Sequence, residues 1–175
     1  MSPVNLSLVN IRAAIPADIP FMMDLERASS TAAHWTEQQY RLLFQKAGEA
    51  AERLVLVVDM LPGGGPAAEG SISPSLLGFL IARHVAGEWE LENIVVAFTA
   101  RREGLGKQLL EALLARAWKT NSEAVFLEVR ESNTAARSLY QRAGFRQTGR
   151  RKSYYAEPAE DAILYRRVLS GPFSQ

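Results

Sequence analysis

The alternation of apolar and polar residues predicts a series of short strands and helices in the N-terminal part. The predicted elements are a strand over residues 6–13, a helix opening at Pro16, a helix over residues 36–50 and a buried strand over residues 53–60. Between residues 61 and 74 the chain is rich in Gly, Pro, Ala and Ser and shows no apolar periodicity. We therefore predict a flexible hairpin loop there.

The C-terminal part predicts strands that alternate with helices. The predicted elements are strands over residues 75–84 and 88–96, a helix over 104–119, a strand over 124–130, a helix over 134–143 and two final strands from Phe145 to near Val168. Strands that alternate with helices pair in parallel, whereas the preceding hairpins are antiparallel. The fold class is therefore α/β, with a mixed central sheet of about seven strands and flanking helices.

Length and composition fit one globular domain over residues 1–175. The chain is 47% hydrophobic and 22% charged, which is ordinary for a soluble protein. It has no cysteine, which excludes disulfides and thiolate catalysis. Its two histidines, His34 and His84, lack ligand spacing, so no metal is predicted. Because no leader pattern or long apolar run is present, we expect a cytoplasmic protein without a membrane partner. We also expect a monomer or weak dimer.

The net charge of the chain is close to neutral. A formal charge of +1 argues against a general nucleic-acid binder. A local basic cluster is formed by Arg142, Arg146, Arg150, Arg151 and Lys152. It is interpreted as a solvated face, with contact to acidic substrate segments or to coenzyme phosphates as the alternative.

The segment 101–107, Arg-Arg-Glu-Gly-Leu-Gly-Lys, has the character of a phosphate-binding loop. Its glycines let the backbone approach an anion, and a helix beginning there would aim N–H groups and its positive dipole end at that anion. A Walker loop requires a glycine where Arg101 stands and a hydroxyl residue where Gln108 stands. A dinucleotide fingerprint requires a third glycine at Leu109. Both of these loop types are therefore disfavoured.

Two motifs carry a resemblance to one family. The pattern Arg/Gln-x-x-Gly-x-Gly/Ala after a strand resembles the acyl-CoA-binding segment of the GNAT superfamily of N-acetyltransferases. Residues 127–145 resemble the Leu-Glu-Val-Arg…Asn-x-x-Ala…Leu-Tyr…Gly-Phe block of RimI-like members, which acetylate protein N-termini, typically the N-terminal alanine of a ribosomal protein. The resemblance runs from about residue 89 to 167, with a weaker echo at 34–37. Residues 97–100 depart from it, since Ala-Phe-Thr-Ala stands where relatives often have Asp/His-Pro-x-Tyr/Phe.

The resemblance implies a GNAT fold that binds acetyl-CoA, without a metal. In that fold two neighbouring parallel strands splay apart and admit the acyl-pantetheine arm. The implied contacts are Ile94, Val95 and Val96 for the arm, and Arg101, Arg102, Glu103, Gly104, Leu105, Gly106 and Lys107 for the pyrophosphate. Asn133 is implied as a further coenzyme contact, for which capping of the following helix is the alternative.

Glu128 is the predicted general base. An N-terminal α-amine has a pKa of about 8 and is largely protonated at neutral pH, so a base assists its attack. Strand alternation places Glu128 on the face opposite its apolar neighbours, and the RimI-like motif implies the same role. The alternatives are that Glu128 is a rim carboxylate paired with Arg130, or that the base is Glu92 or, less strongly, Glu90, on the strand that contacts the acyl arm.

Tyr140 is implied as the proton donor to the departing coenzyme A thiolate. Its alternative is a packing role on an apolar helix face. Tyr154 and Tyr155 match paired tyrosines on a substrate-facing loop of RimI-like relatives, and they are expected to shape the acceptor pocket together with Glu92.

The expected activity is direct acetyl transfer from acetyl-CoA to the N-terminal α-amine of a protein or peptide, with a ribosomal protein as one candidate acceptor. A small-molecule amine or a lysine side chain is the first alternative, because the superfamily shares the donor site while acceptors diverge. A non-catalytic acyl-CoA-binding regulatory module is the second.

Overall fold

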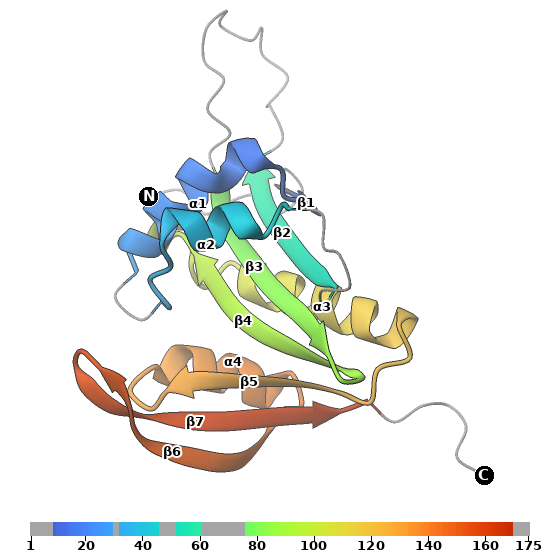
Figure 1. The fold of residues 1–175 in the computed structure, drawn as a ribbon, viewed down its shortest axis with the longest axis vertical. Coiled ribbons are helices and arrows are strands. Elements are labelled where there is room, and N and C mark those ends of the chain that lie inside the picture. The colour runs from blue at the N-terminus through green and yellow to red at the C-terminus, as the bar shows by residue number, and fades with distance from the viewer. Residues whose placement is uncertain (1–8, 30–31, 46–51, 61–75, 170–175) are drawn as a thin grey trace, which may run out of the picture. The chain divides into compact units, whose positions relative to one another are not determined.

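A computed structural model describes residues 9–29, 32–45, 52–60 and 76–169. Its elements are β1 (Val9–Ala13), the 3-10 helix η2 (Pro16–Asp18), α1 (Ile19–Arg27), α2 (Glu37–Leu42), β2 (Arg53–Met60), β3 (Leu76–Val85), β4 (Glu88–Val96), the 3-10 helix η3 (Phe98–Ala100), α3 (Leu105–Lys119), β5 (Ala124–Arg130), α4 (Thr134–Arg142), β6 (Arg146–Ala156) and β7 (Ala159–Val168) (Figure 1). The loop predicted over 61–74 lies outside the described residues.

The seven strands form one mixed sheet in the order β1-β2-β3-β4-β5-β7-β6, which confirms the predicted fold class. β4 and β5 pair in parallel, whereas β5 with β7 and β6 with β7 are antiparallel. The ladder between β4 and β5 runs from Trp89 opposite Val125 to Leu91 opposite Leu127. β4 continues to Val96 and β5 to Arg130, beyond the paired residues.

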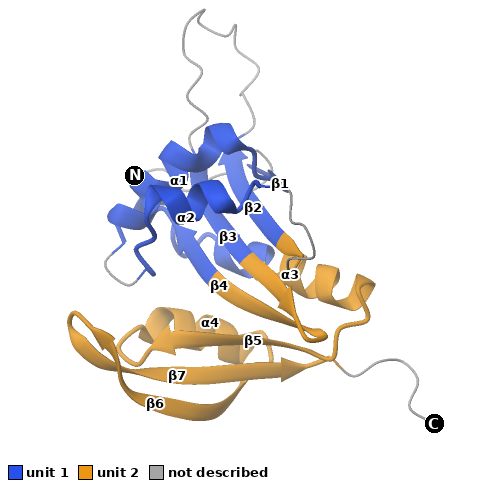
Figure 2. Cartoon of the chain, in the orientation of Figure 1, with its two compact units in different colours: residues 1–46, 54–81, 93–109 blue, residues 47–53, 82–92, 110–175 orange. Residues whose placement is uncertain are grey.

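The chain divides into two compact units (Figure 2). Unit 1 comprises residues 1–46, 54–81 and 93–109, and unit 2 comprises residues 47–53, 82–92 and 110–175. β3, β4 and α3 each contribute residues to both units.

The core of unit 1 is built by α1 and α2 against β2, β3 and β4. It contains Met22 of α1, Tyr40 of α2, Val57 of β2, Phe79 of β3 and Val95 of β4. Burying each such side chain contributes about 1.5–3 kcal/mol.

The second predicted helix is shorter than expected. Its start is as predicted, because the Thr36 hydroxyl accepts from the Gln39 N–H at 3.3 Å and the Gln39 side chain accepts from the Thr36 N–H at 2.8 Å. It ends at Leu42 rather than at residue 50, and residues 43–45 form a turn. The Leu43 N–H bonds to the Tyr40 carbonyl, three residues back, and this tighter turn places Leu43 in the core. Residues 46–50 lie outside the described part.

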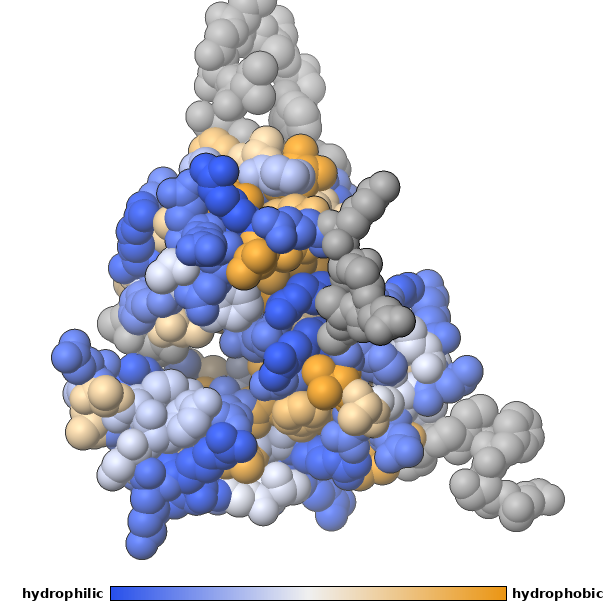
Figure 3. Space-filling view, viewed as in Figure 1, coloured by the Kyte–Doolittle hydropathy of each residue, from blue (hydrophilic) through white to orange (hydrophobic). Residues whose placement is uncertain are grey.

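In unit 2, α4 packs on one face of β5 and β7. That face carries the buried residues Val125, Leu127 and Val129, and Arg137 and Gln141 of α4 bond to the Tyr165 hydroxyl. The opposite face of β5 carries Phe126, Glu128 and Arg130, which are half-buried, as strand alternation predicted. β6 is the edge strand and is almost entirely exposed. The face of the molecule seen in Figure 3 is predominantly hydrophilic. A charged edge strand resists pairing with other chains.

Candidate active site

The predicted phosphate loop connects β4 to α3 in unit 1. Arg102 and Gly104 adopt left-handed backbone, with φ of 67° and 83°. The chain then enters α3 at Leu105, and the Gln108 N–H donates to the Gly104 carbonyl at 3.0 Å. The first turn of a helix directs N–H groups and the positive end of the dipole outward. This is the geometry that a pyrophosphate requires.

Arg101 holds the entry of this loop against the end of β4. Its Nε donates to the Val96 carbonyl at 3.2 Å, and its guanidinium carbon lies 5.6 Å from the centre of the Phe98 ring. Phe98 is 79% exposed and begins the short 3-10 turn η3, in the segment that departs from the family pattern. A direct contact of Arg101 with the coenzyme stays a prediction.

The predicted acyl-arm residues lie on β4 just beyond the ladder with β5. Val95 is buried, while Ile94 and Val96 lie on the half-exposed face of the strand. Glu92 and Glu90 share that face, as expected from their spacing. The ladder with β5 ends at Leu91, and a contact of Ile94, Val95 and Val96 with the acyl arm stays a prediction.

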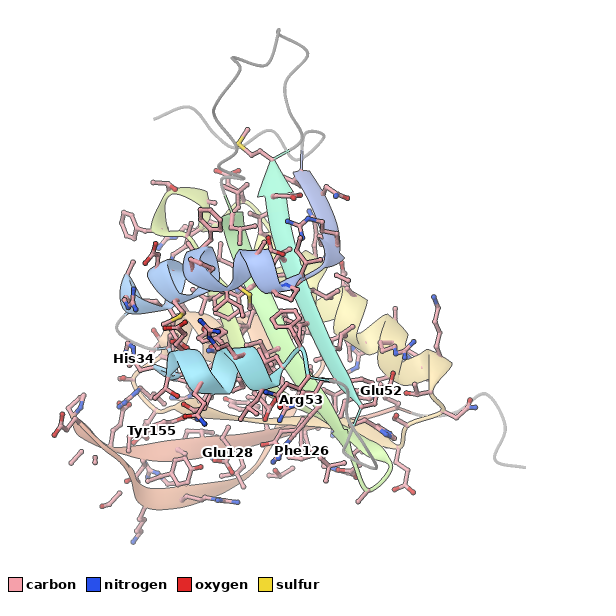
Figure 4. All side chains as sticks on the ribbon, turned by 45° about the horizontal axis from the view of Figure 1, so that its top comes forward. His34, Glu52, Arg53, Phe126, Glu128 and Tyr155 are labelled. Atoms are coloured by element: carbon pink, nitrogen blue, oxygen red, sulfur yellow. The ribbon has the colours of Figure 1, made fainter. Side chains whose placement is uncertain are left out.

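Glu128 lies on the face of β5 that α4 does not cover (Figure 4). Its side chain is 20% exposed, and its Oε1 is 3.0 Å from Nη2 of Arg151 on β6. The negative charge of the Glu128 carboxylate also raises the pKa of the Tyr154 hydroxyl. A carboxylate accepts through both oxygens, so the Arg151 contact leaves further acceptor capacity for an amine.

Arg130 is not the partner of Glu128, contrary to one alternative from the sequence. It contacts Glu160 at 3.3 Å and donates to the Pro158 and Glu157 carbonyls. Its guanidinium carbon also lies 4.1 Å from the centre of the Tyr155 ring. The β6–β7 hairpin therefore engages Arg130, and this leaves Arg151 to pair with Glu128.

The rival Glu92 is more closely surrounded by arginines. Its side chain is 14% exposed and pairs with Arg53, and its Oε1 is 3.4 Å from Arg83 Nε. Burial raises the pKa of Glu92, against the opposing effect of Arg53 and Arg83. Glu90 pairs with Arg83 at 2.7 Å. The pKa direction suits Glu92 as a proton acceptor, but guanidinium groups on both of its oxygens compete with an amine.

Tyr140 of α4 is buried between Phe145 and Tyr165, with ring centres 5.9 and 6.2 Å away. Burial raises the pKa of the Tyr140 hydroxyl, so the phenol remains protonated across the neutral range. A protonated phenol is the form that a proton donor needs. The aromatic contacts also fit the packing alternative, and the donor role stays a prediction.

Asn133 caps α4. Its side-chain oxygen accepts from the Ala136 N–H at 3.1 Å, as the capping alternative described. A contact of Asn133 with the coenzyme stays a prediction.

Sequence reasoning missed the contacts of two charged residues. Arg151 was assigned to a basic surface cluster, and no local pattern in the sequence places it beside Glu128. Glu26 of α1 is only 2% exposed, and its carboxylate accepts from the Trp35 N–H at 2.8 Å and from Asn93 Nδ2 at 2.7 Å. The available signal was a carboxylate at helical spacing from buried Met22.

Two further observations concern the described part of the chain alone. It contains no cluster of three or more His, Asp or Glu side chains able to hold a metal ion. None of its helices combines the length and apolar character that a membrane crossing requires.

Comparison with known proteins links this geometry to one family. The model of the acetyltransferase (GNAT) family matches residues 19–145. The [ribosomal protein bS18]-alanine N-acetyltransferase of Escherichia coli (strain K12) is 40% identical over 97 residues, which are 54% of this chain and 66% of that protein. The protein of the same name from Salmonella typhimurium is 32% identical over 155 residues, or 87% of this chain and 93% of its own length.

A solved structure confirms the implied fold. The crystal structure of the ribosomal-protein-S18-alanine N-acetyltransferase from Escherichia coli superposes with a TM-score of 0.72 at 27% identity, over 95% of this chain and 99% of that one.

Proposed function

The chain belongs to the acetyltransferase (GNAT) family, and on this premise we propose that it transfers the acetyl group of acetyl-CoA to the N-terminal α-amine of a protein or peptide. The observation that carries the acceptor class is the 32% identity, over 87% of the chain, to a relative named for acetylating the alanine of a ribosomal protein. The left-handed loop before α3 and the end of β4 beyond its ladder with β5 support acetyl-CoA as the donor.

In this proposal Glu128 removes the proton that prevents the amine from attacking. Once the ammonium has given that proton to the Glu128 carboxylate, the neutral nitrogen forms a bond to the thioester carbonyl carbon, and the second proton of the bonded nitrogen passes to water. The tetrahedral intermediate then breaks its carbon–sulfur bond, and the Tyr140 hydroxyl donates a proton to the departing thiolate. The raised pKa of Tyr140 keeps its hydroxyl protonated across the neutral range, so the proton is present when the thiolate departs.

The coenzyme contacts proposed for this chain are mostly backbone groups. Ile94, Val95 and Val96 offer strand N–H and carbonyl groups to the pantetheine arm, and the residues from Arg101 to Lys107 offer the helix start to the pyrophosphate. Tyr154 and Tyr155 line the side from which the acceptor approaches Glu128. The cytoplasmic location also remains a proposal.

The test is release of coenzyme A from acetyl-CoA in the presence of different acceptors. Peptides varied at their first two residues are compared with N-blocked peptides that contain lysine and with small free amines. We expect acetylation of free N-termini, with a preference for alanine at the first position. Strong activity on the blocked lysine peptides alone would reject the N-terminal assignment. Tight acetyl-CoA binding without turnover on any acceptor would instead indicate a regulatory module.

A further inference from the structure

Tyr154 and Tyr155 are consecutive residues of β6, yet both lie on the face of the sheet that carries Glu128. The Tyr155 ring lies against the Arg130 guanidinium, and the centre of the Tyr154 ring lies 5.4 Å from the guanidinium carbon of Arg151, which pairs with Glu128. The two rings meet edge to face at 5.2 Å. In a regular strand, consecutive side chains point to opposite faces. A local irregularity must therefore turn one of these two residues.

The irregularity is a bulge of two extra residues in β6. Arg151 pairs with Ala162 and Tyr155 with Glu160, so β6 advances by four residues where β7 advances by two. Within the bulge, Ser153 adopts a left-handed backbone with φ of 50°. Bulges of this kind re-aim a side chain, and here the side chain is that of Tyr154.

Asp161 of β7 holds the bulge in place. Its Oδ1 accepts from the Ser153 N–H at 2.8 Å, and its Oδ2 lies 2.8 Å from Arg150 Nε. Asp161 stands between Glu160 and Ala162 in the strand, so its side chain leaves β7 on the face opposite to Glu128. It therefore does not contact an acceptor that is bound at Glu128.

We propose that Asp161 is a positioning residue for the catalytic base. By fixing the bulge at Ser153, it places Tyr154 against the Arg151 guanidinium that pairs with Glu128, and so orients that carboxylate toward the acceptor amine. The proposal rests on the proposed function, in which Glu128 is the base. Tyr154 stands on an edge strand and is 50% exposed, so the backbone conformation of the bulge determines whether its ring meets Arg151 beside Glu128.

The first test uses the free protein and needs no acceptor. The charged groups that face the Tyr154 hydroxyl are Glu128, Glu90 and Arg151, and the net effect, dominated by Glu128, raises the pKa of Tyr154. Tyrosine labelled with 13C is titrated by NMR, and the Tyr154 signal is assigned with Tyr154→Phe. We expect Asp161→Asn and Ser153→Val to lower the pKa of Tyr154 toward its ordinary value, as Glu128→Gln also does.

Ser153→Gly is the matched control, because glycine adopts the left-handed backbone without strain. It should keep the raised pKa of Tyr154, whereas the β-branched Ser153→Val disfavours that backbone at an exposed position where no core packing is lost. A Tyr154 pKa that is unchanged in both Asp161→Asn and Ser153→Val would overturn the proposal. If Asp161→Asn does not fold, the two Ser153 variants still decide the outcome.

The second test separates this proposal from the proposed function. We expect Asp161→Asn and Ser153→Val to lower kcat by about 10-fold, the scale of one hydrogen bond to a charged group, with the KM for acetyl-CoA unchanged. Ser153→Gly should retain kcat. If Glu128→Gln lowers kcat while these two variants keep it, positioning by Asp161 is wrong and the base assignment survives. If Glu128→Gln itself keeps kcat, the proposed base is wrong.

Discussion

At the scale of single residues, Glu128 is the group whose change should matter most. Glu128→Gln removes the proton acceptor but preserves the size of the side chain, so we expect kcat to fall by about 100-fold or more. The loss should be largest at low pH, where more of the acceptor amine is protonated. Steady-state kinetics against pH, together with acetyl-CoA binding by calorimetry, measure both effects, and binding should change little.

The control for this prediction is Glu123→Gln, which removes the same charge from an exposed position just before β5. It should retain the wild-type kcat. If the Glu128→Gln variant keeps the wild-type kcat, the base is Glu92 or water instead.

Tyr140→Phe tests the proton donor at the same scale. The change removes one hydroxyl from an aromatic cluster with Phe145 and Tyr165 and leaves the ring contacts in place. If the hydroxyl protonates the thiolate, kcat should fall by about 10- to 100-fold, while the melting temperature changes little. A variant with wild-type kcat would assign Tyr140 to packing alone.

At the scale of elements, binding of acetyl-CoA by the loop before α3 can be tested by substituting two glycines. Gly104 and Gly87 both adopt left-handed backbone, with φ of 83° and 86°, and a Cβ at either position would meet no atom within 4 Å. Alanine should therefore cost each position a similar backbone strain of about 1–2 kcal/mol. Only Gly104→Ala should also raise the Kd for acetyl-CoA, because Gly87 lies in the β3–β4 hairpin. Equal affinities in titration calorimetry would argue against the loop as the pyrophosphate site.

Element prediction succeeded where the signal is local. The period of the apolar residues located β4, α3, β5 and α4 within one or two residues, because strand and helix faces repeat over short distances. The second helix was predicted too long, since apolar Leu43 and Phe44 continue its period although the backbone has already turned at Leu43. Tertiary packing of Leu43 overrides the helical pattern there.

At the scale of the whole molecule, we expect the two units to unfold together. β3, β4 and α3 run from one unit into the other, so melting either unit breaks elements of both. In Trp35→Phe, the remaining tryptophans, Trp89 and Trp118, report unit 2 alone. Their fluorescence and the far-ultraviolet circular dichroism should give coincident denaturation curves. Two separated transitions would contradict the prediction of a single domain.

Stability of the whole molecule should also fall in alkali. Burial raises the pKa of the Tyr40 and Tyr140 hydroxyls. Burial also raises the pKa of Tyr155 to about 12, because its effect exceeds the opposing effect of Arg130. The unfolded chain loses these protons near pH about 10, whereas the folded chain retains them. The stability that these raised pKa values contribute to the folded state is therefore complete below pH about 10 and is lost as pH rises above it. Urea unfolding between pH about 8 and about 11 measures the decline, which Tyr140→Phe should make shallower.

The sequence by itself determined the strand and helix order and the family, because each depends on periods, turn residues or motifs within a short segment. It also placed Glu128 on the face of β5 opposite its apolar residues. Only the tertiary structure decided which arginine meets which carboxylate. Arg151 reaches Glu128, and Arg130 turns to the β6–β7 hairpin. These partners depend on the register of β5, β7 and β6 and on a bulge that Asp161 holds, and pairing between distant strands leaves no local signal in the chain.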